Sequence, residues 1–403
     1  MWTLPRLLSS SRRTSGPPDP KRGIHLIGDY SIAIGLGVAF RLLTRALRQA
    51  GYPLAHTQVN LTSDRRTGDH LEPDVQPEAC DITLIHLNGD YMYEWIRHAA
   101  PALRDSKRVI GYWYWELPLF PEVWKKCLPH LDELWVSSRY VQDHAAAISP
   151  VPVVRIPPPI PRIHGTPRRA DFGLPEDRTL FLFIFEPNSN IGRKNPFAII
   201  EAFRKAFAGV ADPPLLVLKT HHLHTVALHQ QLAHDLNAAL RAVGGIMVDA
   251  SWEHPKLLDF IASCDVFVSL HRAEGFGLGM AEAMALCKPV IATGFSGNTD
   301  FMTPGNSYAV DYHLRRITAV DHRYQPEFAG VYEPGQWWAE PDINHAARLM
   351  RQLWEEPAEA ALRAERGQAS IRSLYSVEAI AETIRARLGS VNSWNGNDRK
   401  QRK

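Results

Sequence analysis

The sequence predicts an α/β fold in which two doubly wound parallel sheets face each other across a cleft. Short apolar segments alternate with helical segments along most of the chain, as in parallel strands joined by crossover helices. A proline-rich segment, residues 155–175, interrupts the alternation, which then starts again. The length of 403 residues also exceeds that of one ordinary core. Because such sheets bind ligands at the carboxyl ends of their strands, we expect the site in the cleft.

The first sheet begins after residue 22. A strand over residues 23–28 precedes a loop with Gly35 and Gly37 and an amphipathic helix over residues 38–50. The loop is no dinucleotide fingerprint, because Phe40 stands where the third glycine of GxGxxG belongs. A tight turn and a substrate-facing loop both fit it. Further strands are predicted over residues 54–59, 82–87, 109–113, 134–137 and 153–156, with helices over residues 92–99 and 140–147.

The second sheet follows the proline-rich segment. Its first strand, over residues 179–185, is entirely apolar, which indicates burial on both faces. Further strands are predicted over residues 215–219, 246–249, 266–270, 289–293 and 307–312. Helices are predicted over residues 196–207, 225–243 and 255–263, from near Leu278, and over residues 344–355 and 377–388, the last N-capped by Ser376.

Composition and charge fit an ordinary globular protein. Hydrophobic residues make up 45% and charged residues 22%, and no apolar run is long enough to predict a transmembrane helix. Basic residues outnumber acidic ones in residues 1–22 and 391–403, which we expect to be a disordered arm and tail. Such tails are usually solvated, with contact to an anionic membrane as the alternative, and we expect no nucleic-acid partner. Four cysteines without a CxxC pattern suit free thiols in the cytoplasm.

One stretch, residues 271–301, has the layout of a phosphate site. It reads HRAEGFGLGMAEAMALCKPVIATGFSGNTDF and places a glycine-rich turn between a buried strand and a helix. Gly275 and Gly277 allow close approach of the backbone, and the helix N-terminus favours an anion. Glu274 and Glu282 would repel a phosphate, so they suit neutral hydroxyls, as in ribose recognition. A sugar joined to a nucleoside diphosphate meets both requirements.

Three cations are predicted at the carboxyl ends of buried strands. Arg193 and Lys194 stand in a loop just before a helix, where the helix dipole disfavours cations, so we favour a diphosphate-binding role over a solvated pair. Lys219 ends another strand and would point toward the same cleft, although strand-terminal lysines are common.

The segment over residues 111–124, GYWYWELPLFPEVW, is unusually aromatic. Trp113 and Trp115 could stack on sugar rings, but core packing is the favoured interpretation. Glu116 could accept a hydrogen bond from an acceptor hydroxyl or act as a base. Five histidines over residues 221–234 lack the spacing of metal ligands, so no metal site is predicted.

The motifs together resemble family 4 of the retaining glycosyltransferases, which have the GT-B fold. They are E-x7-E with GFG inside it, then KPVIAT and GNTD, preceded by RKNP. The resemblance covers about residues 23–388 and is strongest over residues 262–301. The segments WYWELPLFPEVW, DELWVSSRY and SLHRAEGFGL are similar to a bacterial branch that builds O-antigen and exopolysaccharide chains.

The resemblance implies a division into two Rossmann-like domains. Residues 23–160 would form the acceptor domain and residues 161–375 the nucleotide-sugar domain. The last helix, within residues 376–390, would cross back onto the first domain.

The resemblance also implies roles for individual residues. Glu274 would meet the hydroxyls of the donor sugar, and Glu282 the ribose. The backbone around Gly275, Phe276, Gly277 and Leu278 would hold the sugar and diphosphate, and Arg193 and Lys194 would neutralise the leaving phosphate. Gly35 and Gly37 would correspond to the N-terminal loop beside the donor phosphates.

The sequence departs from the family pattern at three positions. Asn188 replaces an arginine, so Arg193 or Lys219 must supply the second cation. No acceptor-side histidine is obvious, and Glu116, His86 or Trp115 are the candidates for that side. Cys287 stands where relatives have a glycine, which would cost about 1 kcal/mol if the backbone is left-handed there.

We therefore expect a hexosyltransferase that acts with retention and without a metal or other cofactor. Its donor would be GDP-mannose or, close behind, a UDP-hexose, and its acceptor a glycan or lipid-linked glycan in cell-surface polysaccharide synthesis. It would work in the cytoplasm, at most peripheral to the inner face of the membrane. A sugar-nucleotide epimerase and a non-catalytic sugar-nucleotide-binding protein are the alternatives, and the oligomeric state stays open.

Overall fold

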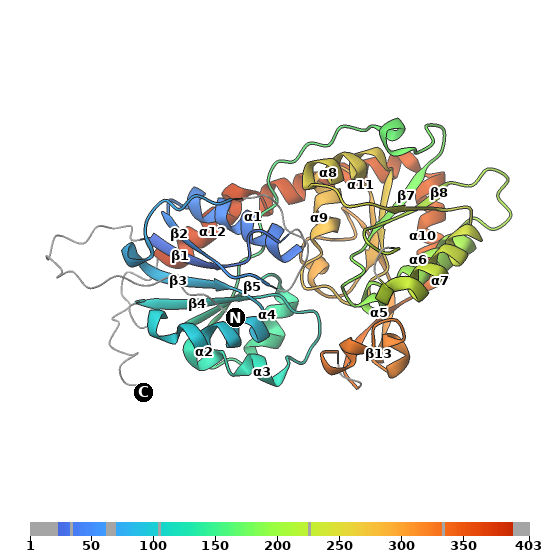
Figure 1. Cartoon of the computed structure of the whole chain (residues 1–403). Coiled ribbons are helices and arrows are strands. Elements are labelled where there is room, and N and C mark those ends of the chain that lie inside the picture. The colour runs from blue at the N-terminus through green and yellow to red at the C-terminus, as the bar shows by residue number, and fades with distance from the viewer. Residues whose placement is uncertain are drawn as a thin grey trace, which may run out of the picture.

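The structure is a computed structural model that describes residues 23–32, 35–61, 70–103, 106–224, 227–332 and 335–389. Two α/β domains lie side by side along the long axis of the molecule (Figure 1). The basic ends that we expected to be disordered, residues 1–22 and 391–403, lie outside the described residues.

The N-terminal domain is built on one parallel sheet. Its strands are β1 (Gly23–Gly28), β2 (Leu54–Gln58), β3 (Cys80–His86), β4 (Arg108–Trp113), β5 (Glu133–Val136) and β6 (Val153–Arg155). Its helices are α1 (Gly35–Gln49), α2 (Gly89–Leu103), α3 (Glu122–Lys125) and α4 (Arg139–Ala146), with 3₁₀ turns at Pro77–Ala79 and Leu128–His130. The six strands run in the order β2-β1-β3-β4-β5-β6, so the chain reverses direction across the sheet between β1 and β3. The crevice at that reversal is where such sheets bind ligands.

The C-terminal domain repeats this plan. Its strands are β7 (Leu180–Ile184), β8 (Leu215–Thr220), β9 (Ile246–Asp249), β10 (Val266–Ser269), β11 (Val290–Thr293) and β12 (Tyr308–Val310). Its helices are α5 (Ile191–Lys194), α6 (Pro196–Ala206), α7 (Gln230–Arg241), α8 (His254–Ser263), α9 (Leu278–Ala285), α10 (Ile343–Glu355) and α11 (Pro357–Leu374), with 3₁₀ turns at Arg169–Phe172, Ala227–His229 and Gly297–Asp300. The order β12-β11-β10-β7-β8-β9 reverses between β7 and β10. The expected fold class, GT-B, is thus confirmed.

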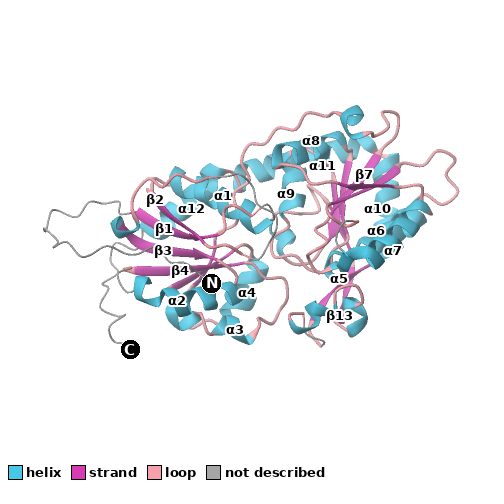
Figure 2. Cartoon of the chain, in the orientation of Figure 1, coloured by secondary structure: helices cyan, strands magenta, loops and turns pink. Residues whose placement is uncertain are grey.

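Helices cover both faces of each sheet, as Figure 2 shows in cyan around the magenta strands. Phe181, Phe203 and Leu218 belong to the core on one face of the second sheet, and Phe260 and Met284 to the core on the other. Burial on both faces explains why the central strands are apolar throughout.

The last helix, α12 (Val377–Gly389), packs on the N-terminal domain. Ile380, Ile384 and Leu388 share one hydrophobic cluster with Phe40 and Leu47 of α1. The red helix beside α1 in Figure 1 is this segment. The end of the chain therefore joins the two domains a second time.

A small subdomain lies outside both sheets, and we call it the insert, residues 312–341. It consists of β13 (Tyr312–Arg316), two 3₁₀ turns (Ala319–His322 and Pro326–Gly330) and β14 (Trp337–Pro341). The two strands pair antiparallel, with Tyr312 opposite Pro341. Figure 1 shows it beneath the C-terminal domain, next to α5. The sequence did not lead us to expect it.

Several elements differ from their predicted bounds. Gly35 and Gly37 lie in the first turn of α1 rather than in a loop, because Gly37 packs on the preceding chain, where a Cβ would stand 2.0 Å from the carbonyl oxygen of Ile32. The expected strand over residues 307–312 is split between β12 and β13, which belong to different sheets. Helix α11 was not predicted, because it buries mostly small residues, such as Ala360 and Gly367, which give a weak periodic signal.

The backbone at Cys287 is left-handed, as the comparison with a glycine position suggested. Its φ is 59°, so a side chain occupies a conformation that usually favours glycine. The position follows the end of α9, where its N–H donates to the carbonyl of Met284. The residue closes the helix as a glycine would.

Candidate active site

The short helix α5 places two cations at the carboxyl end of β7. Asn190 caps its start, and its side chain accepts a hydrogen bond from the Arg193 N–H at 2.8 Å. Asn195 ends it with φ of 57° and donates to the carbonyl of Leu270, just after β10, at 3.0 Å. Arg193 and Lys194 are thereby fixed between the ends of the two strands where the topology reverses.

The glycine-rich turn after β10 is held by both domains. Within the C-terminal domain, the Gly297 N–H donates to the carbonyl of Glu274 at 2.9 Å, and a Cβ on Gly297 would stand 2.3 Å from the carbonyl oxygen of Gly275. From the N-terminal domain, the hydroxyls of Ser137 and Ser138 donate to the same Gly275 oxygen at 2.9 and 2.7 Å. The turn that precedes α9 is therefore held in place by hydrogen bonds from both domains.

Glu274 meets both predicted cations. Its Oε1 lies 3.0 Å from Nη1 of Arg193 and accepts a hydrogen bond from Nζ of Lys194. Burial would raise the pKa of Glu274, but Lys194 and Arg193 outweigh it and lower that pKa to about 2. Burial lowers the pKa of Lys194, and Glu274 opposes that change. Glu274 is thus an ionised carboxylate at any working pH.

Arg193 is more enclosed than Lys194. The side chain of Lys194 is 20% exposed, whereas that of Arg193 is 4% exposed. The Arg193 guanidinium donates to the carbonyl of Ala273 at 2.9 Å and to the hydroxyl of Ser189 at 2.8 Å, and lies 3.5 Å from Glu116. Burial would lower the pKa of Arg193, but the two carboxylates raise it. Lys194 is consequently the cation of this pair that is more open to a ligand.

Glu282 lies one turn inside α9 and is paired. Its Oε1 lies 2.7 Å from Nε2 of His254, the first residue of α8. Burial would lower the pKa of His254, but the hydrogen bond to Glu282 raises it. His254 was not predicted from the sequence, in which its only signal is its place at a helix start.

The remaining donor-side candidates lie in two different settings. Lys219 is buried and donates to the carbonyls of Thr220 and Ala250 at 3.0 and 2.6 Å, with its Nζ 4.9 Å from the centre of the Trp252 ring. Gly35 has open space around it, in contrast to Gly37, at the N-terminal end of α1. The first turn of α1, in the N-terminal domain, therefore has an accessible backbone at Gly35.

We call Arg193, Lys194 and Glu274 the charged cluster. Of the three acceptor-side candidates, Glu116 is the one whose side chain contacts it, through Arg193. Trp115 is buried, stacks on Tyr332 of the insert at 5.7 Å and donates from Nε1 to the carbonyl of Leu119. Trp113 is also buried, so both tryptophans pack in the core. His86 is fully buried and stacks on Tyr112 at 4.9 Å, and burial lowers its pKa to about 3.

The structure adds residues to the site that were not predicted from the sequence. Ser137 and Ser138 follow β5 and could have been found by their place at a strand end. Tyr332 gave no signal at all, because it contacts Glu116 across 216 positions of sequence. Within the described residues, no three His, Cys, Asp or Glu side chains cluster as metal ligands. None of the helices in that same part of the chain has the length and apolar character of a membrane span.

A family model identifies the domain that carries this site. Residues 168–313 match the family described as Glycosyl transferases group 1. This part of the chain, which carries the candidate site, is therefore similar to a group 1 glycosyltransferase domain. Enzymes of this group, family 4 of the GT-B fold, transfer a sugar from a nucleotide-sugar donor with retention, generally without a metal ion. The matched segment contains Lys194, Glu274 and Glu282.

Solved structures show how far the likeness of the fold extends. The sucrose-phosphate synthase of Thermosynechococcus elongatus matches this structure with a TM-score of 0.66 at 16% identity, over 93% of this chain and 100% of that chain. HepE of Anabaena in complex with UDP matches with a TM-score of 0.63 at 14% identity, over 91% and 100%. A glycosyltransferase of Rickettsia africae matches with a TM-score of 0.61 at 13% identity, over 90% and 96%. No curated protein matches the sequence. At these identities the likeness concerns the fold.

Proposed function

We propose that this glycosyltransferase moves a hexose, with mannose as the first candidate, to a glycan or lipid-linked acceptor in cell-surface polysaccharide synthesis. One observation carries the proposal: Lys194 and Glu274 form a charge pair beside the glycine-rich turn at the start of α9. A cation and a helix N-terminus suit the diphosphate of a donor, and a carboxylate suits its sugar hydroxyls.

The geometry suggests how the roles are divided. Lys194 would turn from Glu274 to the leaving diphosphate, and the backbone from Gly275 to Leu278 would hold the phosphates and sugar. Glu282, with His254 beside it, would receive the ribose. Arg193 would hold Glu274 in position rather than bind the ligand, because the Arg193 guanidinium already donates to the Ala273 carbonyl and the Ser189 hydroxyl.

The chemistry requires stabilisation of a leaving anion. Breaking a glycosyl phosphate bond develops negative charge on the diphosphate and positive charge on the sugar. A preorganised cation and helix N-terminus stabilise the anion, which is usually the largest catalytic contribution. In transfer with retention, the acceptor hydroxyl attacks from the face that the diphosphate leaves.

Ligand binding gives the first test. We would measure thermal unfolding of the full chain in EDTA with GDP, UDP, ADP, GDP-mannose and UDP-glucose. UDP-glucose is included because a structural relative, HepE, was solved in complex with it. A ligand at about 100 times its dissociation constant should add roughly 2.7 kcal/mol of stability. A shift with GDP and GDP-mannose alone supports the mannosyl donor, and no shift with any nucleotide contradicts the proposal.

The product gives the second test. NMR of the sugar released or transferred, recorded before mutarotation, should show the anomer of the donor. The opposite anomer would contradict retention, and a changed sugar with no transfer would indicate an epimerase. The same reaction in EDTA should proceed at an unchanged rate.

We also propose that the enzyme acts in the cytoplasm, with its basic ends at the inner face of the membrane. The support is the excess of Lys and Arg within residues 1–22 and 391–403. Co-sedimentation of the full chain with vesicles that contain anionic lipid should exceed that of a chain without these two segments. Equal binding would contradict the membrane contact.

A further inference from the structure

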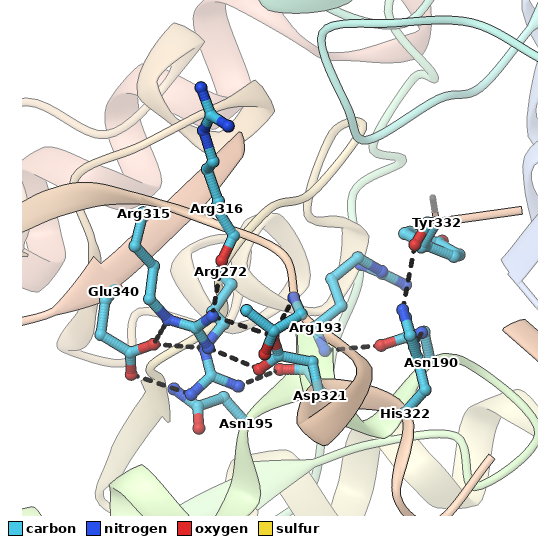
Figure 3. A network of polar contacts seen from close by, with 12 residues as sticks. Asn190, Arg193, Asn195, Arg272, Arg315, Arg316, Asp321, His322, Tyr332 and Glu340 are labelled. Atoms are coloured by element: carbon cyan, nitrogen blue, oxygen red, sulfur yellow. Dashed lines mark hydrogen bonds and ion pairs between the residues drawn. The ribbon is translucent and has the colours of Figure 1, made fainter. Parts of the chain in front are cut away.

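The insert is fastened to the helix that carries Lys194. Arg272 donates to both oxygens of Glu340 at 2.7 and 2.9 Å, and Arg315 pairs with Glu340 and Asp321 (Figure 3). At the start of α5, Gln325 of the insert accepts from the Ile191 N–H at 2.7 Å. These contacts attach the insert to the C-terminal domain beside α5.

Tyr332 extends from the insert to the N-terminal domain. Its hydroxyl donates to Oε2 of Glu116 at 3.1 Å, and its ring stacks on Trp115. Nearby, Gln336 accepts a hydrogen bond from the Leu119 N–H at 3.3 Å. The insert therefore contacts the aromatic segment of the opposite domain, beside the charged cluster.

These contacts hold the Glu116 carboxylate from two sides. Its Oε2 accepts from Tyr332, while its Oε1 faces Arg193 at 3.5 Å. The Glu116 side chain is still 21% exposed, whereas Tyr332 is 5% exposed. Burial and the nearby Glu116 raise the pKa of Tyr332, so its hydroxyl remains a neutral donor. Glu116 is thus an oriented carboxylate that solvent can still reach.

We propose that Tyr332 is a positioning residue that orients Glu116 to accept a hydrogen bond from the acceptor hydroxyl. The inference rests on the proposed function, because it assigns Glu116 to the acceptor side of a transfer site. Tyr332 itself touches no reacting atom and acts through Glu116. A water molecule that hydrolyses the donor would occupy the same place as a sugar hydroxyl.

The test compares Tyr332→Phe with Tyr324→Phe in the full chain. Both changes remove one hydroxyl from the insert, but that of Tyr324 bonds Asp235 instead of Glu116. We would measure nucleoside diphosphate release from UDP-glucose or GDP-mannose, with water as acceptor. Tyr332→Phe should lower kcat about tenfold, as expected for a lost bond to a charged group, and leave the donor KM unchanged. Tyr324→Phe should match the wild type.

Two readouts separate positioning from a structural role. The double variant Tyr332→Phe with Glu116→Gln should be no slower than Glu116→Gln alone. The second readout is the split between kcat, which should fall in Tyr332→Phe, and the donor KM, which should not change, because a general loss of structure would alter both. Arg193, Lys194 and Tyr140 also act on Glu116 and are present in both tyrosine variants, but Tyr332→Phe additionally removes the hydrogen bond between the Tyr332 hydroxyl and Arg193.

The outcomes can be told apart. A wild-type chain that binds and turns over no nucleotide-sugar overturns the proposed function and this inference with it. An active wild type with an unaffected Tyr332→Phe variant overturns the inference alone. Equal losses in Tyr332→Phe and Tyr324→Phe, or additive losses in the double variant, also overturn it.

Discussion

Lys194 is the residue on which the proposed chemistry depends most directly. It contacts Glu274 and is more exposed than its neighbour Arg193. Lys194→Ala should lower kcat about 100-fold or more, because removal of one preorganised group at a developing anion has effects of that size. The measurement is the rate of nucleoside diphosphate release at saturating donor.

A matched control is Lys205→Ala, since Lys205 lies on α6 and bonds Asn344 on the outer surface. It should retain wild-type turnover. A normal kcat in Lys194→Ala would show that this lysine does not stabilise the leaving diphosphate.

The His254 and Glu282 pair predicts a dependence of stability on pH. Burial lowers the pKa of His254, but the hydrogen bond to Glu282 and the charge of Glu282 together raise it above its usual 6.5, against the smaller opposing effects of Arg41 and Arg45. A raised histidine pKa contributes stability that is fully present below the unfolded value and is lost as pH rises through the folded value. Thermal unfolding from about pH 5.5 to 8.5 should show this loss.

In Glu282→Gln that part of the pH dependence should disappear, because the neutral amide no longer favours the charged imidazole. His164→Gln, at an exposed histidine, is the control and should keep it. If wild type and Glu282→Gln gave parallel curves, the pair would not be coupled in solution.

At the scale of elements, α12 supports the N-terminal domain from the far end of the chain. Ile384 is fully buried against the α1 cluster. Ile384→Ala should lower the free energy of unfolding by about 2–4 kcal/mol through the cavity that it leaves. Urea unfolding measures this loss, and Thr383→Ala at the adjacent exposed position should change stability little. Equal stabilities would mean that α12 detaches in solution.

The elements also show what sequence can predict. The apolar strands and the glycine-rich turn were predictable, because local patterns determine them: a buried strand is apolar along its length, and a helix start beside glycines has few alternatives. The burial of Trp113 and Trp115 followed from their apolar character. The insert was not predictable, because its strands pair across residues that are far apart and its polar side chains serve ion pairs with Arg272.

The same distinction applies to the candidate site: local patterns predict which residues belong to it, but not how these residues contact one another. Lys194 and Glu274 could be selected because each stands in a loop that follows a predicted buried strand and precedes a predicted helix. Three features depend on contacts between distant segments, which a sequence period does not predict. They are the contact between Lys194 and Glu274, the burial of Arg193 and the pairing of Glu282 with His254. The contact of Tyr332 with Glu116 could not be predicted, because it depends on the packing of one domain against the other.

For the whole molecule, Asp300 joins the two domains on the side of α4. Its Oδ2 accepts from Nη1 of Arg155 and from the Arg139 N–H, both at 2.9 Å. Asp300→Ala should lower transfer about tenfold, because loss of a charged contact of this kind costs about 1.5–3 kcal/mol and frees the domains to separate. Small-angle X-ray scattering should show a larger radius of gyration.

Asp259→Ala is the control, since Asp259 bonds the Thr166 N–H within the C-terminal half and joins no domains. It should leave scattering and transfer unchanged. An Asp300→Ala protein with wild-type dimensions and rate would show that other contacts are enough to hold the two domains together.

The ends of the insert lie next to each other, because Tyr312 pairs with Pro341 in the β13–β14 ladder. A segment that leaves and rejoins its host at one point can be replaced as a unit without moving the host's ends. The glycine-rich turn and α9 lie elsewhere in the chain, but Arg272, just before that turn, pairs with Glu340 of the insert. Replacement of this segment would therefore leave the two ends of the host chain in place, but it would also remove Gln325, which accepts a hydrogen bond from the Ile191 N–H at the start of α5.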